Sequence, residues 1–240
     1  MATPTVQEEL ASLLGVTVRR SAVIGRPYLI YATAMSVLLT VSLSVTSRAG
    51  FSSGLPLLLP IFVAVGAMGG LTVFTSDRLK GVLEYLMAYG VTPRRLFLNV
   101  LLASFVLVTI VLGVALGVGV GLNLARRTAL PLDFALAVGL YTVPMSYASV
   151  AFSTTIGMYW SALSSPRQGL NSPVGLAPFI GILPSVATLA AVIALGANGV
   201  SASAFFTVAV IAMALVTIVV VLLLSMIGRL LRRERLLSPA

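Results

Sequence analysis

Residues 96–125 read LFLNVLLASFVLVTIVLGVALGVGVGLNLA, a stretch without a single Asp, Glu, Lys or Arg. A helix needs about 20 consecutive apolar residues to cross the hydrocarbon core of a bilayer. A charge at the bilayer centre costs about 2.5–3.5 kcal/mol, so Arg95 and Arg126 mark the limits of such a crossing. The residues are continuously apolar and do not alternate as a membrane strand does. The stretch therefore predicts one transmembrane helix.

Further uncharged stretches lie on both sides of this one. Three of them suit a single crossing each, and they lie between Arg26 and Arg48, Arg48 and Asp77, and Asp133 and Arg167. The uncharged run at 168–228 would form a helix about three times as long as the hydrocarbon core is thick, so it must fold back. Gly and Asn at 196–201 provide a turn there. Six spans are predicted, near residues 27–47, 55–75, 97–123, 134–160, 174–195 and 204–228.

Composition agrees with an all-α integral membrane protein. Of the 240 residues, 59% are hydrophobic and 9% are charged, against about 25% charged in soluble domains. The net charge of +9 does not point to nucleic acid, because the arginines lie between apolar runs without interleaved aromatics. We expect membrane lipids around a single transmembrane domain, residues 1–240. Its parts are an interfacial helix (1–26), spans 1 and 2 (27–75), a loop (76–95), spans 3 to 6 (96–228) and a basic tail (229–240).

The basic residues also predict the orientation in the cell membrane. Cytoplasmic loops are enriched in Lys and Arg. With six spans, three basic residues fall on one side, Arg48, Arg126 and Arg127, and twelve on the other. Both termini are therefore expected in the cytoplasm. The twelve are Arg19, Arg20, Arg26, Arg78, Lys80, Arg94, Arg95, Arg167, Arg229, Arg232, Arg233 and Arg235.

The N-terminal segment has the pattern of a helix that lies on the membrane surface. Thr5 and Glu8 fit a capping box, in which each side chain bonds a free N–H at the start of a helix. Apolar residues share one face at helical spacing, and polar residues take the other side, as an interfacial helix requires. The alternative is a frayed soluble tail. The apolar face consists of Val6, Leu10, Leu13 and Leu14.

The chain lacks the residues on which most site chemistry depends. It has no Cys and no His, which removes the thiolate ligands and the commonest general base. The six acidic residues lie in expected loops, tails or span ends, whereas a secondary transporter normally needs ionisable groups at mid-membrane. We therefore expect no catalytic residue, no metal site and no cofactor on this chain. A secondary transporter stays a weaker alternative.

Small and polar residues suggest how the spans pack. Gly113, Gly117 and Gly121 repeat every four residues, a pattern that lets two helices approach closely, although Gly is also common in membrane helices. Prolines should bend the fourth and fifth spans. Serines on the fourth span could line a substrate path or bond to neighbouring helices. The prolines are Pro144, Pro178 and Pro184; the serines are Ser146, Ser149 and Ser153.

The loop at 76–95, SDRLKGVLEYLMAYGVTPRR, predicts a short amphipathic helix between the second and third spans. Leu79, Leu83, Leu86 and Met87 share one face, and Lys80 and Glu84 form an i,i+4 pair on another. Gly90 suits the C-terminal cap of this helix. Thr92 and Pro93 suit the cap and first turn of the helix that follows.

This loop resembles that of the permease subunits of type 2 ABC transporters, mostly exporters. Their loop reads approximately acidic-R-x-x-G-T-L-E-x-L-L-x-x-P-V-S-R-x-E-L. Gly81, Leu83, Glu84, Leu86 and Met87 match its G-x-L-E-x-L-L core, and 91–95 matches the segment that restarts the helix. Three positions depart from the pattern: Val82 for the usual Thr, Tyr89-Gly90 for a small residue and Pro, and Arg95 or Leu96 where an acid is common.

The resemblance implies that this loop is a coupling helix that docks into a cytoplasmic ATPase subunit. The ATPase, with its ATP and magnesium, is expected on a separate chain in two copies, since Lys80 lacks the Gly-rich approach that cradles phosphate. A second copy of this chain or a similar permease would complete the transporter. The alternatives are a solvated connection and a non-transporting membrane scaffold. The expected coupling residues are Gly81, Leu83, Glu84, Tyr85, Leu86, Met87, Tyr89 and Arg94.

Overall fold

The computed structural model describes residues 6–46, 55–66, 68–127, 132–163 and 173–197, and parts of 207–225. Every regular element within these ranges is a helix, so the expected all-helical class is confirmed for them. The elements are α1 (Val6–Ile24), α2 (Arg26–Thr46), α3 (Leu55–Gly66), α4 (Met68–Leu79), α5 (Val82–Ala88), α6 (Pro93–Ala125), α7 (Leu132–Ala137), the π-helix η1 (Val138–Thr142), α8 (Val143–Leu163) and α9 (Pro173–Ala197).

Among the described residues, four helices are long and apolar enough to cross a membrane. They cover Arg26–Val45, Leu57–Leu79, Pro93–Ala125 and Ala135–Trp160, close to the first four expected spans. The second extends beyond the expected end at 75, because α4 continues to Leu79. Shorter apolar helical stretches occur at Ile182–Ala191 and Val210–Val219. The four helices indicate a multi-pass membrane protein.

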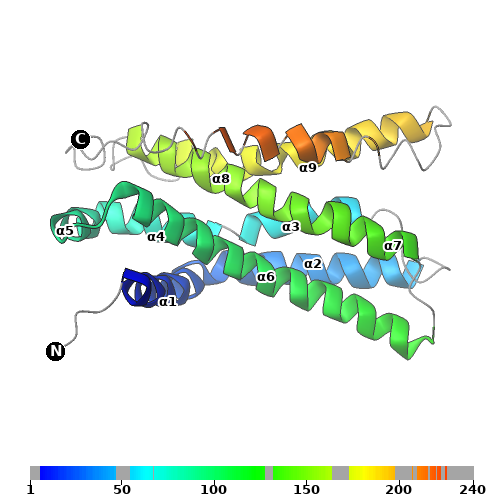
Figure 1. Cartoon of the computed structure of the whole chain (residues 1–240). Coiled ribbons are helices and arrows are strands. Elements are labelled where there is room, and N and C mark those ends of the chain that lie inside the picture. The colour runs from blue at the N-terminus through cyan, green and yellow to red at the C-terminus, as the bar shows by residue number, and fades with distance from the viewer. Residues whose placement is uncertain are drawn as a thin grey trace.

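The long helices run lengthwise through the molecule, and α1 and α5 lie at one end (Figure 1). α1 is seen nearly end-on in this view while α2 runs lengthwise, so the chain turns at Gly25 between them. Residues 6–24 form a regular helix and are not frayed, while the place of this helix on the membrane surface stays a prediction. Thr5 lies outside the described residues, and so do the side chains of Val6 and Leu10.

α6 has the N-terminal cap that its sequence predicts, and a hydrogen bond connects its C-terminal end to α2. The side chain of Thr92 accepts a hydrogen bond from the Arg95 N–H, and Pro93 takes the first position, so both predictions for this cap are confirmed. At the other end, Nη1 of Arg126 donates to the backbone carbonyl of Ser44 in α2. α6 has 33 residues, about 50 Å of helix, so it exceeds the thickness of a hydrocarbon core.

The fourth candidate span contains a π-helical turn, η1, directly before Pro144. Proline has no N–H to give to the carbonyl four residues earlier and its ring crowds that carbonyl. In the residues just before it, η1 adopts the wider turn, with the Val143 N–H bonded to the Val138 carbonyl. The expected disturbance at Pro144 thus takes the form of a π-bulge. Pro178 and Pro184 lie inside α9, which is assigned as one helix through both.

The described core forms three clusters along the bundle. One, at the α5 end, joins α4, α5, α6 and α8. The middle cluster joins α2, α3, α6 and α8, and the third lies around Tyr141 of η1 and Met145 of α8. The cluster at the α5 end fixes the position of the loop that the sequence singles out. Its members are Leu71, Phe74, Leu83, Met87, Phe97, Val100, Leu101, Ala151 and Met158.

Candidate functional site

α5 is a seven-residue helix bounded by two glycines with left-handed backbone. Gly81 precedes it with φ 71°, and Gly90 follows it with φ 86°, a region that residues with a Cβ avoid. After Gly90 turns, the Gly90 N–H bonds the Met87 carbonyl and the Val91 N–H bonds the Leu86 carbonyl. These two bonds form a Schellman motif, so the predicted cap at Gly90 is confirmed.

One face of α5 is buried against its own chain. Leu83 is 1% exposed and Met87 is 2% exposed, and both pack with Phe74 of α4, Phe97 of α6 and Met158 of α8. Both residues were expected to enter a partner's groove. They are not available for that at the surface of this chain. Their role in the described structure is to fix α5 to the end of the bundle.

The opposite face of α5 carries two tyrosines in contact, with their ring planes inclined at 49°, and a carboxylate. Tyr85 is 62% exposed and Tyr89 73%, with ring centroids 4.6 Å apart. The Tyr85 hydroxyl donates to the Tyr89 hydroxyl at 3.1 Å. This bond, with a smaller effect of burial, raises the pKa of Tyr85 above its ordinary value. Glu84 and Ala88 are exposed beside them. We call Glu84, Tyr85, Ala88 and Tyr89 the outer face of α5.

The break at Gly81 corrects two details of the predicted helix. Leu79 ends α4 and is exposed, so it does not share the buried face of Leu83 and Met87. Lys80 lies in the turn between α4 and α5 while Glu84 lies on α5, and no ion pair joins them, because the left-handed Gly81 interrupts the helix. Of the other expected coupling residues, Leu86 is half-buried and Arg94 is exposed on the first turn of α6.

An ion pair that sequence reasoning missed lies at the base of α5. Asp77 in the last turns of α4 is 5% exposed, and its carboxylate accepts two hydrogen bonds from Arg20 of α1. Arg20 was interpreted only as a topology signal. The sequence held one hint of the pair, an acidic residue directly after the apolar run of the second span.

The expected packing glycines have open surroundings in this chain. Gly113, Gly117 and Gly121 are exposed, and a Cβ added at any of them would meet nothing within 4 Å. Close helix contacts occur instead at other glycines. A Cβ on Gly25 would lie 2.3 Å from the Cα of Gly69, and one on Gly70 would lie 2.2 Å from the Ser104 hydroxyl oxygen. The close helix contact that the repeat predicts is therefore not seen among the described residues, and a contact of these glycines with another helix stays a prediction.

The three serines of the expected substrate path are buried between helices. The Ser146 hydroxyl donates to the Thr142 carbonyl at 2.6 Å, and the hydroxyls of Ser149 and Ser185 lie 3.2 Å apart across α8 and α9. Ser153 is buried one helical turn further along α8. Ser149 thus bonds to a neighbouring helix, as the alternative from the sequence expects, whereas Ser146 bonds a carbonyl one turn earlier in its own span. Their lining of a substrate path stays a prediction.

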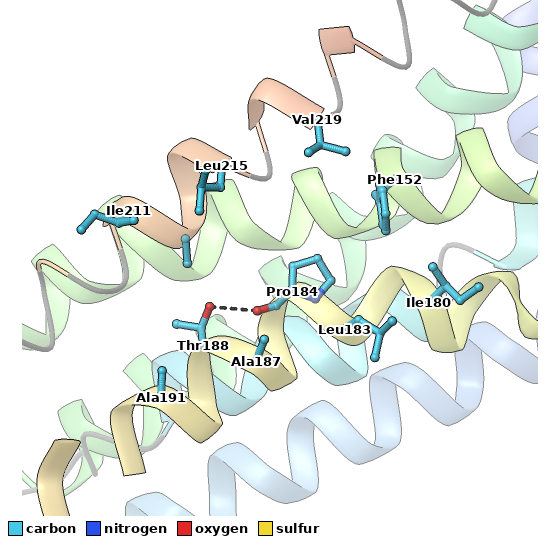
Figure 2. Close-up of a pocket in the computed structure, with 11 residues that line it drawn as sticks. Phe152, Ile180, Leu183, Pro184, Ala187, Thr188, Ala191, Ile211, Leu215 and Val219 are labelled. Atoms are coloured by element: carbon cyan, nitrogen blue, oxygen red, sulfur yellow. Dashed lines mark hydrogen bonds between the residues drawn. The ribbon is translucent and has the colours of Figure 1, made fainter. Parts of the chain in front are cut away.

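An apolar pocket of about 530 Å³ lies between α8, α9 and the helical residues 211–219 (Figure 2). Its walls are almost entirely aliphatic, with Phe152 at one side. Among the described lining residues the one hydroxyl belongs to Thr188, and it donates to the Pro184 carbonyl at 2.8 Å. Such a pocket suits an apolar molecule and offers no group for acid–base chemistry.

Comparison with known proteins does not add a relative. The chain matches no protein-family model, no curated protein and no solved structure. Within the described ranges, no three His, Cys, Asp or Glu residues gather as metal ligands would. The class that fold and composition define is a multi-pass, all-helical membrane protein, with an accessible aromatic and acidic face on a short helix at one end.

Proposed function

We propose that this chain is the membrane-spanning subunit of an ATP-driven ABC transporter of the type 2 exporter class. The observation that carries the proposal is α5 itself. It is a short helix fixed to the bundle end by Leu83 and Met87, and it follows one candidate span and precedes another. Its outer face is open to a partner. This combination adds to the sequence resemblance of the loop.

In this proposal the chain crosses the membrane six times, with the end that carries α5 in the cytoplasm. Charge supports the orientation, since the described basic residues concentrate near that end and only Arg126 and Arg127 are described at the other. These residues are carried by α1, the start of α2, the end of α4 with the turn after it, and the start of α6: Arg19, Arg20, Arg26, Arg78, Lys80, Arg94 and Arg95. The fifth and sixth crossings would include Ile182–Ala191 and Val210–Val219.

The outer face of α5 would dock into a groove of a separate ATPase subunit, which binds ATP and magnesium. A rigid helix joined to two spans can pass the movement of the ATPase to the membrane part as a rigid-body motion. Paired tyrosines are common anchors in protein interfaces, and Glu84 adds a charge that fixes the orientation of docking. Two ATPase copies and a second permease chain complete the transporter.

The first test is whether an ABC ATPase is encoded next to this chain. The second is co-purification of the two proteins, together with ATPase turnover in vesicles. Glu84→Arg should leave folding intact, because Glu84 is exposed. A charge reversal in a partly desolvated contact costs several kcal/mol, and about 1.4 kcal/mol corresponds to tenfold in affinity. We expect at least a tenfold loss of ATPase binding, with a similar loss for Tyr85→Ala.

Arg127→Glu is the matched control, because it reverses an exposed charge at the opposite end of the bundle. It should bind the ATPase as the wild type does. If Glu84→Arg and Tyr85→Ala both leave binding and turnover unchanged, α5 is not the coupling element. The scaffold alternative would then be favoured, and so it would if the wild-type chain retained no ATPase.

A further inference from the structure

The end of α4, which leads into α5, is joined to α1 by the ion pair between Arg20 and Asp77. Nη1 of Arg20 donates to Oδ2 of Asp77 at 2.9 Å, and Nη2 donates to Oδ1. A guanidinium that bonds both carboxylate oxygens fixes the relative orientation of two groups as well as their distance. Because Asp77 is almost fully buried, Arg20 also supplies the charge that offsets its removal from water.

α1 and α4 meet at a second point as well. At the end of α1, the backbone of Gly25 approaches that of Gly69 so closely that a Cβ on Gly25 would overlap the Gly69 Cα. Gly69 and Asp77 are eight residues apart, about 12 Å along α4. Two contacts at that separation prevent α4 from pivoting on either one.

α5 is attached to the part of α4 that this ion pair holds. Asp77 lies two residues before α4 ends at Leu79, and the buried face of α5 packs on Phe74, less than one turn before Asp77. A shift of this last part of α4 would therefore carry α5 with it. The contacts connect α1, α4 and α5 in series.

We infer that Arg20 is a positioning residue for α5, because through Asp77 it holds α1, the last turns of α4 and α5 as one unit. Without Arg20 the buried carboxylate loses its cation, and the end of α4 is drawn toward water. α5 would then occupy a range of positions instead of one. The inference deepens the proposed function, and rests on it only for the consequence that coupling to an ATPase suffers.

Distance measurement between spin labels tests the unit directly. The sequence has no Cys, so cysteines at Gly15 in α1 and Ala88 in α5, both exposed, would be the sole labelling sites. Labelled chain is diluted with unlabelled chain so that only distances within one chain are recorded. The wild type should give one narrow distance distribution. Arg20→Gln and Asp77→Asn should each broaden and shift it, and the double variant should do no more than either.

Arg19→Gln is the matched control. Arg19 is the residue next to Arg20, carries the same charge and is exposed. This variant should keep the narrow distribution. If Arg20→Gln does not accumulate in the membrane, Arg20→Lys takes its place, because Lys keeps the charge but lacks the two-pronged guanidinium. An unchanged distribution in the Arg20 variant that accumulates would overturn the inference, as would equal broadening in Arg19→Gln.

ATPase turnover of the same Arg20 and Asp77 variants, made without the added cysteines and measured with the ATPase bound, connects the unit to function. The outer face of α5 is untouched in Arg20→Gln, so binding should be retained while transport-linked turnover falls. If the label distances change as expected but the wild type binds no ATPase, the proposed function fails and the inference stands. If the distances do not change while the wild type binds and stimulates the ATPase, the inference fails and the function stands.

Discussion

Glycine has opposite surroundings in two regions of this protein. In the C-terminal half of α6, Gly113, Gly117 and Gly121 follow a regular four-residue repeat. A Cβ added at any of them would meet nothing within 4 Å. Where α4 crosses the junction of α1 and α2, Gly25 and Gly69 follow no such repeat, yet their backbones are in contact. A sequence repeat therefore identifies a helix face on which close approach is possible, and the contact itself depends on a distant partner segment.

The difference follows from the membrane as a solvent. In water, the apolar face of a helix is the face that packs, but in lipid both the packed face and the exposed face are apolar. α6 shows this, since Leu98, Leu102 and Ile110 are exposed while Leu107 and Val111 of the same helix are buried. Hydropathy alone therefore does not separate the two faces.

The largest effect in this comparison is expected at Gly25. Gly25→Ala places a methyl group against the backbone of Gly69, which has no side chain that can move away. Overpacking costs about 1–3 kcal/mol, and a contact with backbone should lie at the upper end. Thermal unfolding of the detergent-solubilised chain should show a clear loss of stability. Gly15→Ala, on α1 with nothing within 4 Å, is the control and should show none; equal stability of the two variants would contradict the close contact.

An intermediate effect is expected at Gly70. Here the added Cβ meets the hydroxyl of Ser104, a side chain that can rotate, so Gly70→Ala should cost about 1 kcal/mol. The combination with Ser104→Ala removes that hydroxyl and should recover part of the loss in the same unfolding measurement. If the two substitutions are simply additive, the two residues do not share the contact.

The smallest effect is expected at Gly117. Gly117→Leu adds a side chain where the chain leaves open space, so the stability of the isolated chain should change by no more than about 0.5 kcal/mol. The same variant in the complete transporter sharpens the comparison. A loss of stability that appears only there would place a second chain against α6, and an equally stable complex would mean that the glycines face lipid.

Charge spacing predicted much of the fold. The four candidate spans lie close to the stretches that charged residues delimit, although the second continues past Asp77 to Leu79 and the third already begins at Pro93. The cap at Thr92 and Pro93 is where local chemistry placed it. The span limits and this cap are predictable because each depends on single residues or on residues adjacent in sequence. The π-turn before Pro144 was predicted only as a bend, because the sequence does not say how the freed carbonyl is accommodated.

The site was predicted less completely. The existence of α5 and the cap at Gly90 follow from local sequence, but the left-handed turn at Gly81 shifts the start of the helix and separates Leu79 from it. The pairing of Arg20 with Asp77 joins residues 57 positions apart, and nothing in local spacing selects Arg20 over the exposed Arg19 beside it.

The two glycines around α5 also have a consequence for the order of folding during synthesis. All the backbone bonds of α5 and its turns close within residues 76–91, so the helix can form soon after this segment is made. Its burial is different, since Leu83 and Met87 also pack on Met158 of α8, which is synthesised much later. Until α8 is inserted, Leu83 and Met87 lack the part of their packing that Ala151 and Met158 supply, so part of the apolar face of α5 stays uncovered at that stage of synthesis.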